Sequence, residues 1–486
     1  IELYNADDCF ATLALHQWVE TIFQDQLKNE HPLERPELLS GDANEKVSED
    51  DERARVLYEG LVAGLSDDPD NWTEEEKAKW LLAHQIQFYR RELKSAIWEF
   101  YRLNDLEPSE LLTERKGVFG LVFKETVEAS KMGIPTDRYT YPAQEISLEI
   151  GKELWEPKAK SAVGKINYFS LEDRTVDIKK TRNTAEIHPF AVHTREVVSP
   201  GVLVPSLYTF AEEIIQSGVH GDGLYRAGRD LLVKNPPRLK SEDTFGLKDG
   251  ETIESGSLRL AKDLDQSILP IQGPPGTGKT YIGAGLIAEL VKEGKKVGVT
   301  AVSHKVIRGL LDRTKARANE KGIDLAIKHK PKSGTPISKD DLVLIKDKNA
   351  AIANLQAGAV VGGTSWLWAD DDFEGQLDYL FVDEAGQMSL TNVLTISRAT
   401  KNLVLLGDPQ QLEQPKKGAH PEGADISALE HLLDGKQTIA KDRGLFLDTT
   451  WRLNPNITAF TSKLYYDGRL ISREGLEVQV IKGQTR

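Results

Sequence analysis

Apolar side chains recur every three or four positions in two stretches near the start of the chain, and this spacing predicts helices. The first stretch covers the first 22 residues and the second about residues 80–103. A charge-rich stretch from Glu30 to Glu52 lies between them and is expected to be a loop. The aromatic side chains of the second stretch, including Trp98 and Tyr101, follow its apolar periodicity, so we predict that they lie in a core rather than stacking on nucleobases.

The pattern changes to short β-prone runs between about residues 117 and 198. Turn residues separate runs at 118–123, 146–150, 164–168 and 175–178, which predicts a small barrel. Helical spacing returns at about residues 205–217 and 224–233, before the breaker Asn-Pro-Pro at 235–237 and a polar stretch. From there strands and helices alternate. This alternation favours an α/β fold with a parallel sheet.

Composition argues against membrane-spanning, disulfide-bonded and nucleic-acid-coating proteins. The chain has 486 residues, 39% of them hydrophobic, and lacks an apolar run of about 18 residues, so no membrane-spanning helix is expected. A single cysteine, Cys9, excludes an intramolecular disulfide and predicts a cytoplasmic location. The net charge of −14 argues against coating of nucleic acid, although it allows a local basic cleft. Because the chain starts without Met and ends without closing a domain, we expect a piece of a longer protein.

A phosphate-binding pattern follows the apolar run at residues 269–271. Glycines let backbone N–H groups surround the phosphates of a nucleotide, the lysine adds a positive charge, and the threonine hydroxyl can ligate Mg²⁺. Bound ATP or GTP is therefore predicted at a helix N-terminus. The residues of this pattern are Gly273, Pro274, Pro275, Gly276, Thr277, Gly278, Lys279 and Thr280.

A phosphate-binding loop needs a partner carboxylate that holds Mg²⁺ and activates water, and two acids at the end of another apolar run supply it. Asp383 is predicted to face the metal, and Glu384 to orient and deprotonate the attacking water. A third apolar run at residues 402–406 leads into residues 407–412, where Gln411 could sense the γ-phosphate.

Together, residues 273–280, 383–387 and 407–412 resemble superfamily 1 helicases of the 5′-to-3′ group, and the resemblance spans roughly residues 200–486. It implies a RecA-like P-loop NTPase sheet with helices on both faces, with ATP and Mg²⁺ as cofactors. It also implies a monomeric motor on single-stranded nucleic acid, DNA favoured. The residues that it implies as catalytic are Lys279, Glu384, Gln411 and Arg452, the last in a segment that opens a second RecA-like domain, and those that it implies as strand contacts are Thr300, Ser303 and Thr364.

Two departures from the family limit what the chain is expected to do. Residues 258–265 lack the glutamine that reads adenine in many relatives, which leaves base selectivity open. The rest of the second RecA-like domain is expected beyond Arg486, so the chain should bind ATP but hydrolyse it poorly. An RNA helicase of the same superfamily stays an alternative. A nucleotide-gated adaptor that does not translocate is another, although Glu384 argues against it.

A weaker pattern lies at the start of the chain. Tyr4 and Asp8 have the Tyr-x-x-x-Asp spacing of ribonuclease H-like exonucleases, in which Asp8 would complete a two-metal site and Tyr4 would orient water. With the helicase segments, the chain resembles bacterial fusions of a RecB-like nuclease region, a ribonuclease H-like domain and this helicase. The other carboxylates of the exonuclease would lie before Ile1, so the chain itself is expected to have no nuclease activity.

The expected organisation follows from these patterns. It comprises the last helix of a ribonuclease H-like domain (1–22), a helical connector (23–115), a small β-barrel-like domain (116–200), a helical segment and linker (201–256), the first RecA-like domain (257–440) and the start of a second one (441–486). The barrel resembles one that precedes the motor in relatives and can grip the strand. Its basic residues give that role an electrostatic basis, with a solvated surface as the equal alternative: Lys116, Lys124, Lys131, Lys165, Lys179, Lys180 and Arg182.

Overall fold

The computed structural model describes residues 2–28, 45–130, 132–158, 161–331, 343–412, 415–421 and 423–479. The chain divides into two units, Ile1–Arg53 and Ala54–Arg486. The first unit contains helix α1 (Glu2–Lys28), which ends six residues later than the helix expected from the sequence. The side chains of Tyr4 and Asp8 lie outside the described part of α1. Among the described residues, no helix is long and apolar enough to cross a membrane.

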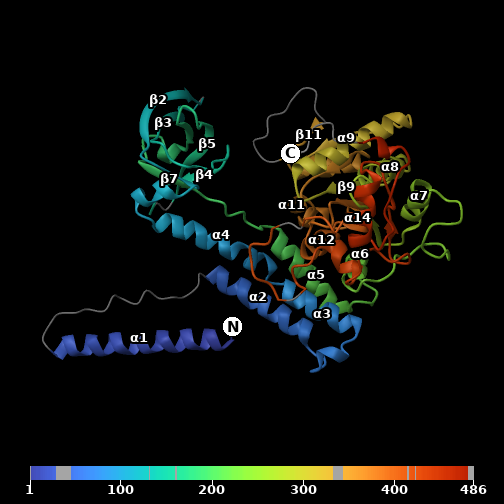
Figure 1. Cartoon of the computed structure of the whole chain (residues 1–486), viewed down its shortest axis with the longest axis horizontal. Helices are drawn as coiled ribbons and strands as arrows, with labels where there is room; N and C mark the ends of the chain where they lie inside the picture. Colours follow the sequence, from blue (N-terminus) through green and yellow to red (C-terminus); the bar gives the residue numbers. More distant parts are fainter. Residues whose placement is uncertain are drawn as a thin grey trace. The chain divides into compact units, whose positions relative to one another are not determined.

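Three helices lead from the first unit to the β-rich part of the chain: α2 (Glu45–Val62), α3 (Glu74–Gln85) and α4 (Phe88–Asp105). Two expectations were wrong here. The charge-rich stretch contains the start of α2, and the single helix predicted at 80–103 is split around Ile86 and Gln87. Ile86 and Phe88 are both buried in one core, and the break turns the chain from that core along α4 (Figure 1).

Trp98 and Tyr101 were also predicted wrongly, because they are 66% and 57% exposed. Helix α4 is buried at its two ends only, by Phe88 and Tyr89 at the first end and by Leu103 at the second. Its middle passes between two cores with one side facing solvent. Helical spacing therefore identified a helix correctly, but it could not show that the apolar stripe is only partly covered.

Residues 117–194 form an antiparallel sheet (Figure 1). Its strand order is β1-β7-β4-β5-β6-β3-β2. Its strands are β1 (Gly117–Phe119), β2 (Val122–Ala129), β3 (Pro135–Thr140), β4 (Glu153–Trp155), β5 (Ala162–Ser170), β6 (Thr175–Lys180) and β7 (Ala191–Thr194). The runs predicted at 164–168 and 175–178 are confirmed within β5 and β6.

The other two predicted runs need correction. The run at 118–123 is divided between β1 and β2 at Gly120, which has a φ of 72°. The run at 146–150 is not a strand. The Gln144 amide just before it bonds both the N–H and the C=O of Phe119, so a side chain takes the place of a paired strand at that edge.

The larger sheet carries the nucleotide pattern and has the order β11-β10-β12-β9-β13-β14-β8-β15, with every pair parallel. This confirms the predicted α/β class. Its strands are β8 (Ile268–Gln272), β9 (Val297–Thr300), β10 (Ile327–His329), β11 (Val343–Leu344), β12 (Val360–Gly362), β13 (Leu377–Asp383), β14 (Thr400–Gly407) and β15 (Leu445–Phe446).

Two hydrophobic cores cover the two faces of this sheet. Leu380 and Val382 of β13 lie in one core, whereas Tyr379 and Phe381 lie in the other, as the alternation of side chains along a strand requires. Helices on the first face are α5 (Leu203–Ser217), α6 (Arg226–Leu232), α12 (Leu390–Ser397) and α13 (Ala428–Leu433). Helices on the second face are α7 (Ile253–Asp263), α8 (Lys279–Lys292) and α9 (His304–Glu320).

The remaining elements are short. They are α10 (Lys348–Gln356), α11 (Ser365–Trp368), α14 (Pro455–Tyr465), the parallel pair β16 (Thr449–Thr450) and β17 (Ile471–Ser472), and 3₁₀ turns at Pro69–Asn71, Pro108–Thr113, Arg182–Thr184, Asp371–Phe373 and Leu476–Val478. The predicted helices at 205–217 and 224–233 correspond to α5 and α6, which pack on the large sheet. Strand β15 belongs to that sheet as well, so the chain leaves it after Phe446.

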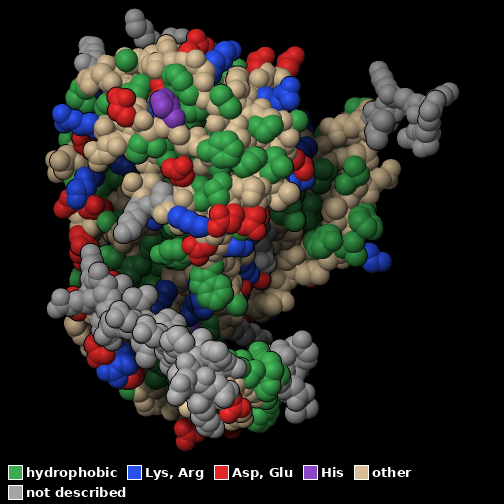
Figure 2. All heavy atoms as spheres, turned by 90° about the vertical axis from the view of Figure 1, so that its left-hand side faces the viewer, with side chains coloured by type: hydrophobic (Ala, Val, Ile, Leu, Met, Phe, Trp, Pro, Cys, Tyr) green, Lys and Arg blue, Asp and Glu red, His purple; other side chains and the backbone are tan. Residues whose placement is uncertain are grey.

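The basic residues of the smaller sheet do not form one continuous surface. Lys180 is buried there, and its pKa is lowered to about 8, mainly by burial. Lys116 pairs with Glu196, and Lys165 lies 3.7 Å from Glu153. Lys131 lies outside the described residues. On the face seen in Figure 2, basic and acidic side chains are interspersed.

Candidate functional site

The predicted nucleotide residues meet at the carboxyl ends of three neighbouring strands. The phosphate-binding loop follows β8, the acidic pair ends β13, and the Gln411 segment follows β14, which lies between the other two strands. Ligands of open α/β sheets bind at this edge, because the loops that leave parallel strands converge there. The arrangement therefore brings together residues more than a hundred positions apart in the sequence.

The phosphate-binding loop has the conformation that its glycines allow. Gly276 and Gly278 have φ angles of 79° and 90°, a region that other residues rarely adopt. At Gly273 a Cβ would lie 2.4 Å from Cγ of Lys279, so the lysine side chain can fold back over the loop only because this residue is glycine. Lys279 Nζ donates to the Gly273 carbonyl at 2.5 Å.

Two further bonds stabilise this loop. The Thr277 hydroxyl donates to the Pro274 carbonyl at 2.8 Å, and the Gly273 N–H donates to the Gly407 carbonyl at 2.9 Å. The second bond ties the loop to the end of β14. Thr280 follows Lys279 in the first turn of α8 and is half-buried. The loop is thus preformed at the N-terminus of a 14-residue helix, where backbone N–H groups attract an anion.

The acidic pair lies beside this loop. Asp383 is 3% exposed, and burial together with the neighbouring charge of Glu384 raises its pKa to about 6, while Lys279 acts in the opposite direction. Glu384 has a φ of 54°, which is strained for a residue with a side chain, and its N–H donates to Asp383 Oδ1 at 3.0 Å. Within the described part of the chain, Glu384 Oε2 is buried without a hydrogen-bond partner.

These observations fit a magnesium site. The buried carboxylate of Asp383 and the half-buried one of Glu384 repel each other, and a divalent cation would relieve that repulsion. The described residues contain no group of three or more His, Cys, Asp or Glu side chains that could hold a metal ion without other ligands. Asp383 and the Thr280 hydroxyl would therefore share the ion with the phosphates, as is usual for Mg²⁺ in nucleotide sites.

The raised pKa of Asp383 predicts a pH-dependent stability. The unfolded carboxyl releases its proton near pH 3.8 and the folded one near 6, so the folded state binds more protons in that window and its stability falls as pH rises through it. Asp383→Asn removes the free-energy cost of ionising this carboxyl in the folded state. Without magnesium, we expect the variant to match the wild type below about pH 4 and to be more stable by roughly 3 kcal/mol above pH 6, at about 1.4 kcal/mol per pKa unit. Thermal unfolding across pH measures this, and a difference that does not change with pH would contradict it.

Gln411 is held by a contact that the sequence did not reveal. Its Nε2 donates to Asp408 Oδ2 at 3.2 Å, and the Tyr466 hydroxyl donates to the same oxygen at 2.8 Å. Asp408 is 1% exposed, and burial followed by the charge of Asp408 raises the pKa of Tyr466 above its usual value. Since Tyr466 directly follows α14, the Gln411 segment is linked to the part of the chain beyond the large sheet.

The segment that carries Arg452 packs directly on the phosphate-binding loop. The Trp451 N–H donates to the Gly276 carbonyl at 2.9 Å, and the Thr450 hydroxyl donates to the Pro275 carbonyl at 2.9 Å. A Cβ on Gly276 would lie 2.5 Å from Cβ of Arg452. Gly276 is therefore needed for this close approach as well as for its backbone angle. The exposed Arg452 side chain starts next to the place where phosphates would bind.

The three predicted strand-contacting residues differ in accessibility. Ser303 caps α9 by accepting the Val306 N–H at 3.3 Å, and Thr364 precedes α11, with both residues half-buried. They share one edge because β9 and β12 are neighbours. Thr300 is a correction: its side chain is fully buried, because β9 lies inside the sheet between β12 and β13, and it cannot touch a strand in this conformation.

Known proteins resemble this chain over the region that holds the site. Residues 259–425 match the AAA domain family. The DNA replication ATP-dependent helicase/nuclease DNA2 of Saccharomyces cerevisiae is 26% identical over 296 residues, which cover 56% of this chain and 18% of that protein. Regulator of nonsense transcripts 1 of Caenorhabditis elegans is 27% identical over 257 residues, which cover 45% of this chain and 23% of that protein.

The chain thus spans about a fifth of the length of these relatives. Among solved structures, the arterivirus nonstructural protein 10 helicase aligns with a TM-score of 0.33 and 10% identity, covering 73% of this chain and 60% of that one. This likeness is too slight to support an argument about the site. Over residues 259–425 the chain is therefore similar to AAA domains, and over a longer region it is similar to ATP-dependent helicases.

Proposed function

We propose that this chain is the ATP-dependent motor of a superfamily 1 helicase that moves along single-stranded nucleic acid, with DNA favoured. The observation that carries the proposal is the meeting of the loop at 273–280, the acids Asp383 and Glu384 and the segment of Arg452 at one sheet edge. Ser303 and Thr364 lie further along the same edge. Nucleotide and strand would then bind to loops of a single rigid sheet.

The roles of the residues follow from their positions. Loop N–H groups and Lys279 would hold the β- and γ-phosphates, and Thr280 with Asp383 would hold Mg²⁺, which neutralises the charge of the phosphates when bound. Glu384 would orient the attacking water and take its proton, since its Oε2 has no other partner in the described part of the chain. Gln411 would detect the γ-phosphate and pass its state to Tyr466 through Asp408.

Arg452 gives a testable part of this mechanism. A guanidinium at the γ-phosphate stabilises charge that develops in the transition state, so Arg452→Ala should lower the ATP turnover of the complete protein by a factor on the order of 10³, with little change in ATP affinity. Turnover and nucleotide binding measured separately give the two effects. Lys463→Ala, an exposed basic residue of α14, is the control. Equal losses of turnover and affinity would make Arg452 a structural residue.

The choice between DNA and RNA is the main test of the proposal. The relatives include proteins named for DNA replication and others named for nonsense transcripts, so similarity does not separate DNA from RNA. ATP hydrolysis by the complete protein should increase with single-stranded DNA, and RNA of the same sequence should compete more weakly. A stronger effect of RNA would support the RNA helicase, and no effect of either would contradict the motor.

We also propose that the complete protein is a monomeric, cytoplasmic fusion of nuclease and helicase. Two observations support the fusion, the spacing of Tyr4 and Asp8 on α1 and the helicase/nuclease name of one relative. The monomeric state follows from the family resemblance, and the cytoplasmic location from the single Cys9. Reading the gene on both sides of the chain tests it. Upstream carboxylates with metal-ligating spacing and a downstream arginine-bearing RecA-like domain are expected, and an open frame without them would contradict the fusion.

A further inference from the structure

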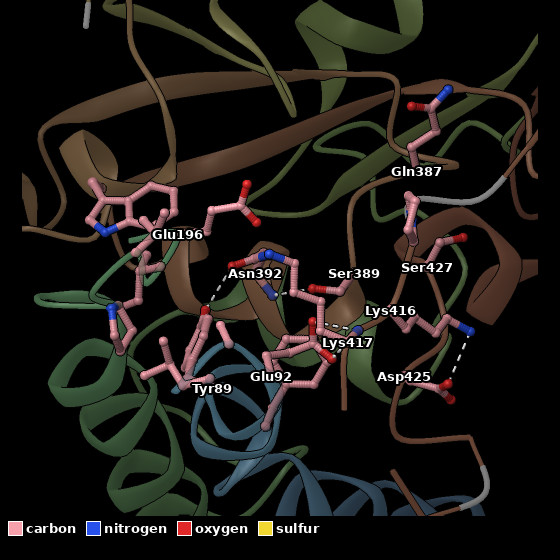
Figure 3. Close-up of a pocket in the computed structure, with 18 of the residues that line it drawn as sticks. Tyr89, Glu92, Glu196, Gln387, Ser389, Asn392, Lys416, Lys417, Asp425 and Ser427 are labelled. Atoms are coloured by element: carbon pink, nitrogen blue, oxygen red, sulfur yellow. Dashed lines mark hydrogen bonds and ion pairs between the residues drawn. The ribbon is translucent and has the colours of Figure 1, made fainter. Parts of the chain in front are cut away.

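The loop that follows the Gln411 segment is attached to α4 by one carboxylate. Glu92 Oε1 accepts the Gly418 N–H at 3.0 Å and lies 2.7 Å from Nε2 of His420 (Figure 3 shows Glu92 beside Lys417). Both carboxylate oxygens lie 3.3 Å from the Lys417 N–H. One side chain of α4 thus binds three residues of the loop, which are separated from it by more than 300 positions in the sequence.

The histidine of this contact has a defined protonation pattern. Arg91 Nε donates to His420 Nδ1 at 3.1 Å, so Nδ1 must be the acceptor and Nε2 must carry the proton donated to Glu92. The His420 side chain is fully buried and stacks on Phe88 with 4.7 Å between ring centroids. Each polar atom of the ring therefore has a partner on α4, which makes the contact specific.

Gly418 brings the loop against the helix backbone itself. A Cβ at this position would lie 2.6 Å from the carbonyl oxygen of Arg91 and 3.0 Å from the N–H nitrogen of Glu92. Those atoms belong to the helix backbone and cannot move aside. Any side chain on residue 418 would therefore lift the loop from α4, which provides a second, independent way to break the contact.

The same end of α4 contacts the segment that follows the acidic pair. The Tyr89 hydroxyl lies 2.8 Å from Asn392 Oδ1 in α12 (Figure 3). It also lies 3.1 Å from Thr395 Oγ1 of the same helix. A cavity of about 250 Å³ lies between α4 and these segments, and Gln387, at the end of the turn after Glu384, lines it. The first turns of α4 therefore touch both segments that leave the predicted γ-phosphate site.

The far end of α4 contacts the smaller sheet. The Phe100 ring lies 5.0 Å from Trp155 and 5.7 Å from His193, measured between centroids, and Arg102 pairs with Glu114 at 2.6 Å. The Asn104 carbonyl accepts the Lys158 N–H at 2.7 Å. An 18-residue helix is about 27 Å long, so α4 is a rigid connection between the nucleotide edge and this sheet.

We propose that Glu92 is a positioning residue that fixes residues 417–420 on α4, so that a movement of the Gln411 segment on ATP binding reaches the smaller sheet through α4. This inference rests on the function proposed above, together with the expectation from the sequence that the smaller sheet also grips the strand. A ligand that moves one end of a rigid helix changes the affinity at the other end, and the coupling is reciprocal. Glu92 touches neither ligand and acts only through the loop.

The experiment measures how ATP changes strand affinity in the complete protein. The dissociation constant of a labelled single-stranded DNA is determined with and without a non-hydrolysable ATP analogue. We expect the analogue to change this constant about tenfold in the wild type, within the usual range of allosteric coupling, and by less than about twofold in Glu92→Ala and in Gly418→Ala. Lys94→Ala is the matched control, because Lys94 also lies on α4 but is exposed, and its ammonium lies over the Trp98 ring, away from the contacts at both ends of the helix.

The outcomes separate this inference from the proposed function. Wild-type coupling that persists in both Glu92→Ala and Gly418→Ala would overturn the positioning role while leaving the motor intact. Equal loss of coupling in Lys94→Ala would overturn it as well, because the effect would then be general to α4. If the wild type fails to bind the analogue or the strand, the proposed function itself fails. Affinity for the analogue alone should stay unchanged in both variants, which a collapsed fold would not allow.

Discussion

Replacement of Lys279 by alanine should abolish ATP binding, with a loss of at least about a hundredfold in affinity. The ammonium group contributes a charge-assisted bond to the phosphates, worth roughly 1.5–3 kcal/mol, and its loss also removes the charge that balances them. Lys279 Nζ already lies within the loop, 2.5 Å from the Gly273 carbonyl, so little ordering is required when a phosphate replaces that partner. Titration with a fluorescent ATP analogue measures the effect.

The control for this variant lies on the same helix. Lys292 is exposed in the last turn of α8, far from the loop, and Lys292→Ala should bind ATP as the wild type does. Thermal unfolding of both variants checks that the fold is retained. Wild-type affinity in Lys279→Ala would contradict the assignment of residues 273–280 as the phosphate-binding loop, and with it every role proposed for the neighbouring residues.

Replacement of Glu384 by glutamine should stop turnover but spare ATP binding. The amide keeps the shape of the side chain and cannot take a proton from water, and general-base catalysis contributes about 10²–10⁴-fold. We therefore expect ATP turnover by the complete protein to fall about 10³-fold. Because glutamine can adopt the φ of 54° at this position about as readily as glutamate, the loop backbone should not change. Single-turnover hydrolysis and nucleotide binding measure the two properties.

A second glutamate tests whether the effect is local. Glu293 lies just beyond the C-terminal end of α8 and pairs with Lys262, so Glu293→Gln should hydrolyse ATP at the wild-type rate. Undiminished turnover in Glu384→Gln would remove Glu384 from the catalytic role. A wild-type protein that binds ATP without any turnover would instead support the nucleotide-gated adaptor.

The contrast between confirmed and corrected elements has a physical cause. The strands β5 and β6 and the helices α5 and α6 were predictable because the spacing of their apolar residues matches the face that each buries locally. The prediction of a strand at 146–150 failed because the Gln144 side chain, which lies outside that run, bonds the backbone N–H and C=O of Phe119 at the edge of β1. The prediction that Trp98 and Tyr101 lie in a core failed for the same kind of reason, since nothing in the sequence of the helix itself shows that α4 leaves a core.

The residues of the candidate site likewise divide into those that the sequence predicted and those that only the structure revealed. The loop at 273–280 and the acids 383–384 are continuous in sequence, and their chemistry depends on local order: glycines with positive φ before a helix, and two acids after a buried strand. Asp408 and Tyr466 could not be predicted, because their bond joins residues 58 positions apart on different elements. The burial of Thr300 depends on β12 and β13 on either side of its strand.

By itself, the sequence predicted the chemistry proposed for this protein, from a phosphate-binding loop and an acidic pair, and it determined the parallel α/β class, because each is encoded by neighbouring residues and short-range periodicity. Only the tertiary structure decided which of these residues meet. The packing of Arg452 on Gly276, the contact of Gln411 with Asp408 and Tyr466, and the attachment of residues 417–420 to Glu92 all join segments distant in sequence. Such contacts depend on how strands are ordered in a sheet, which no local pattern specifies.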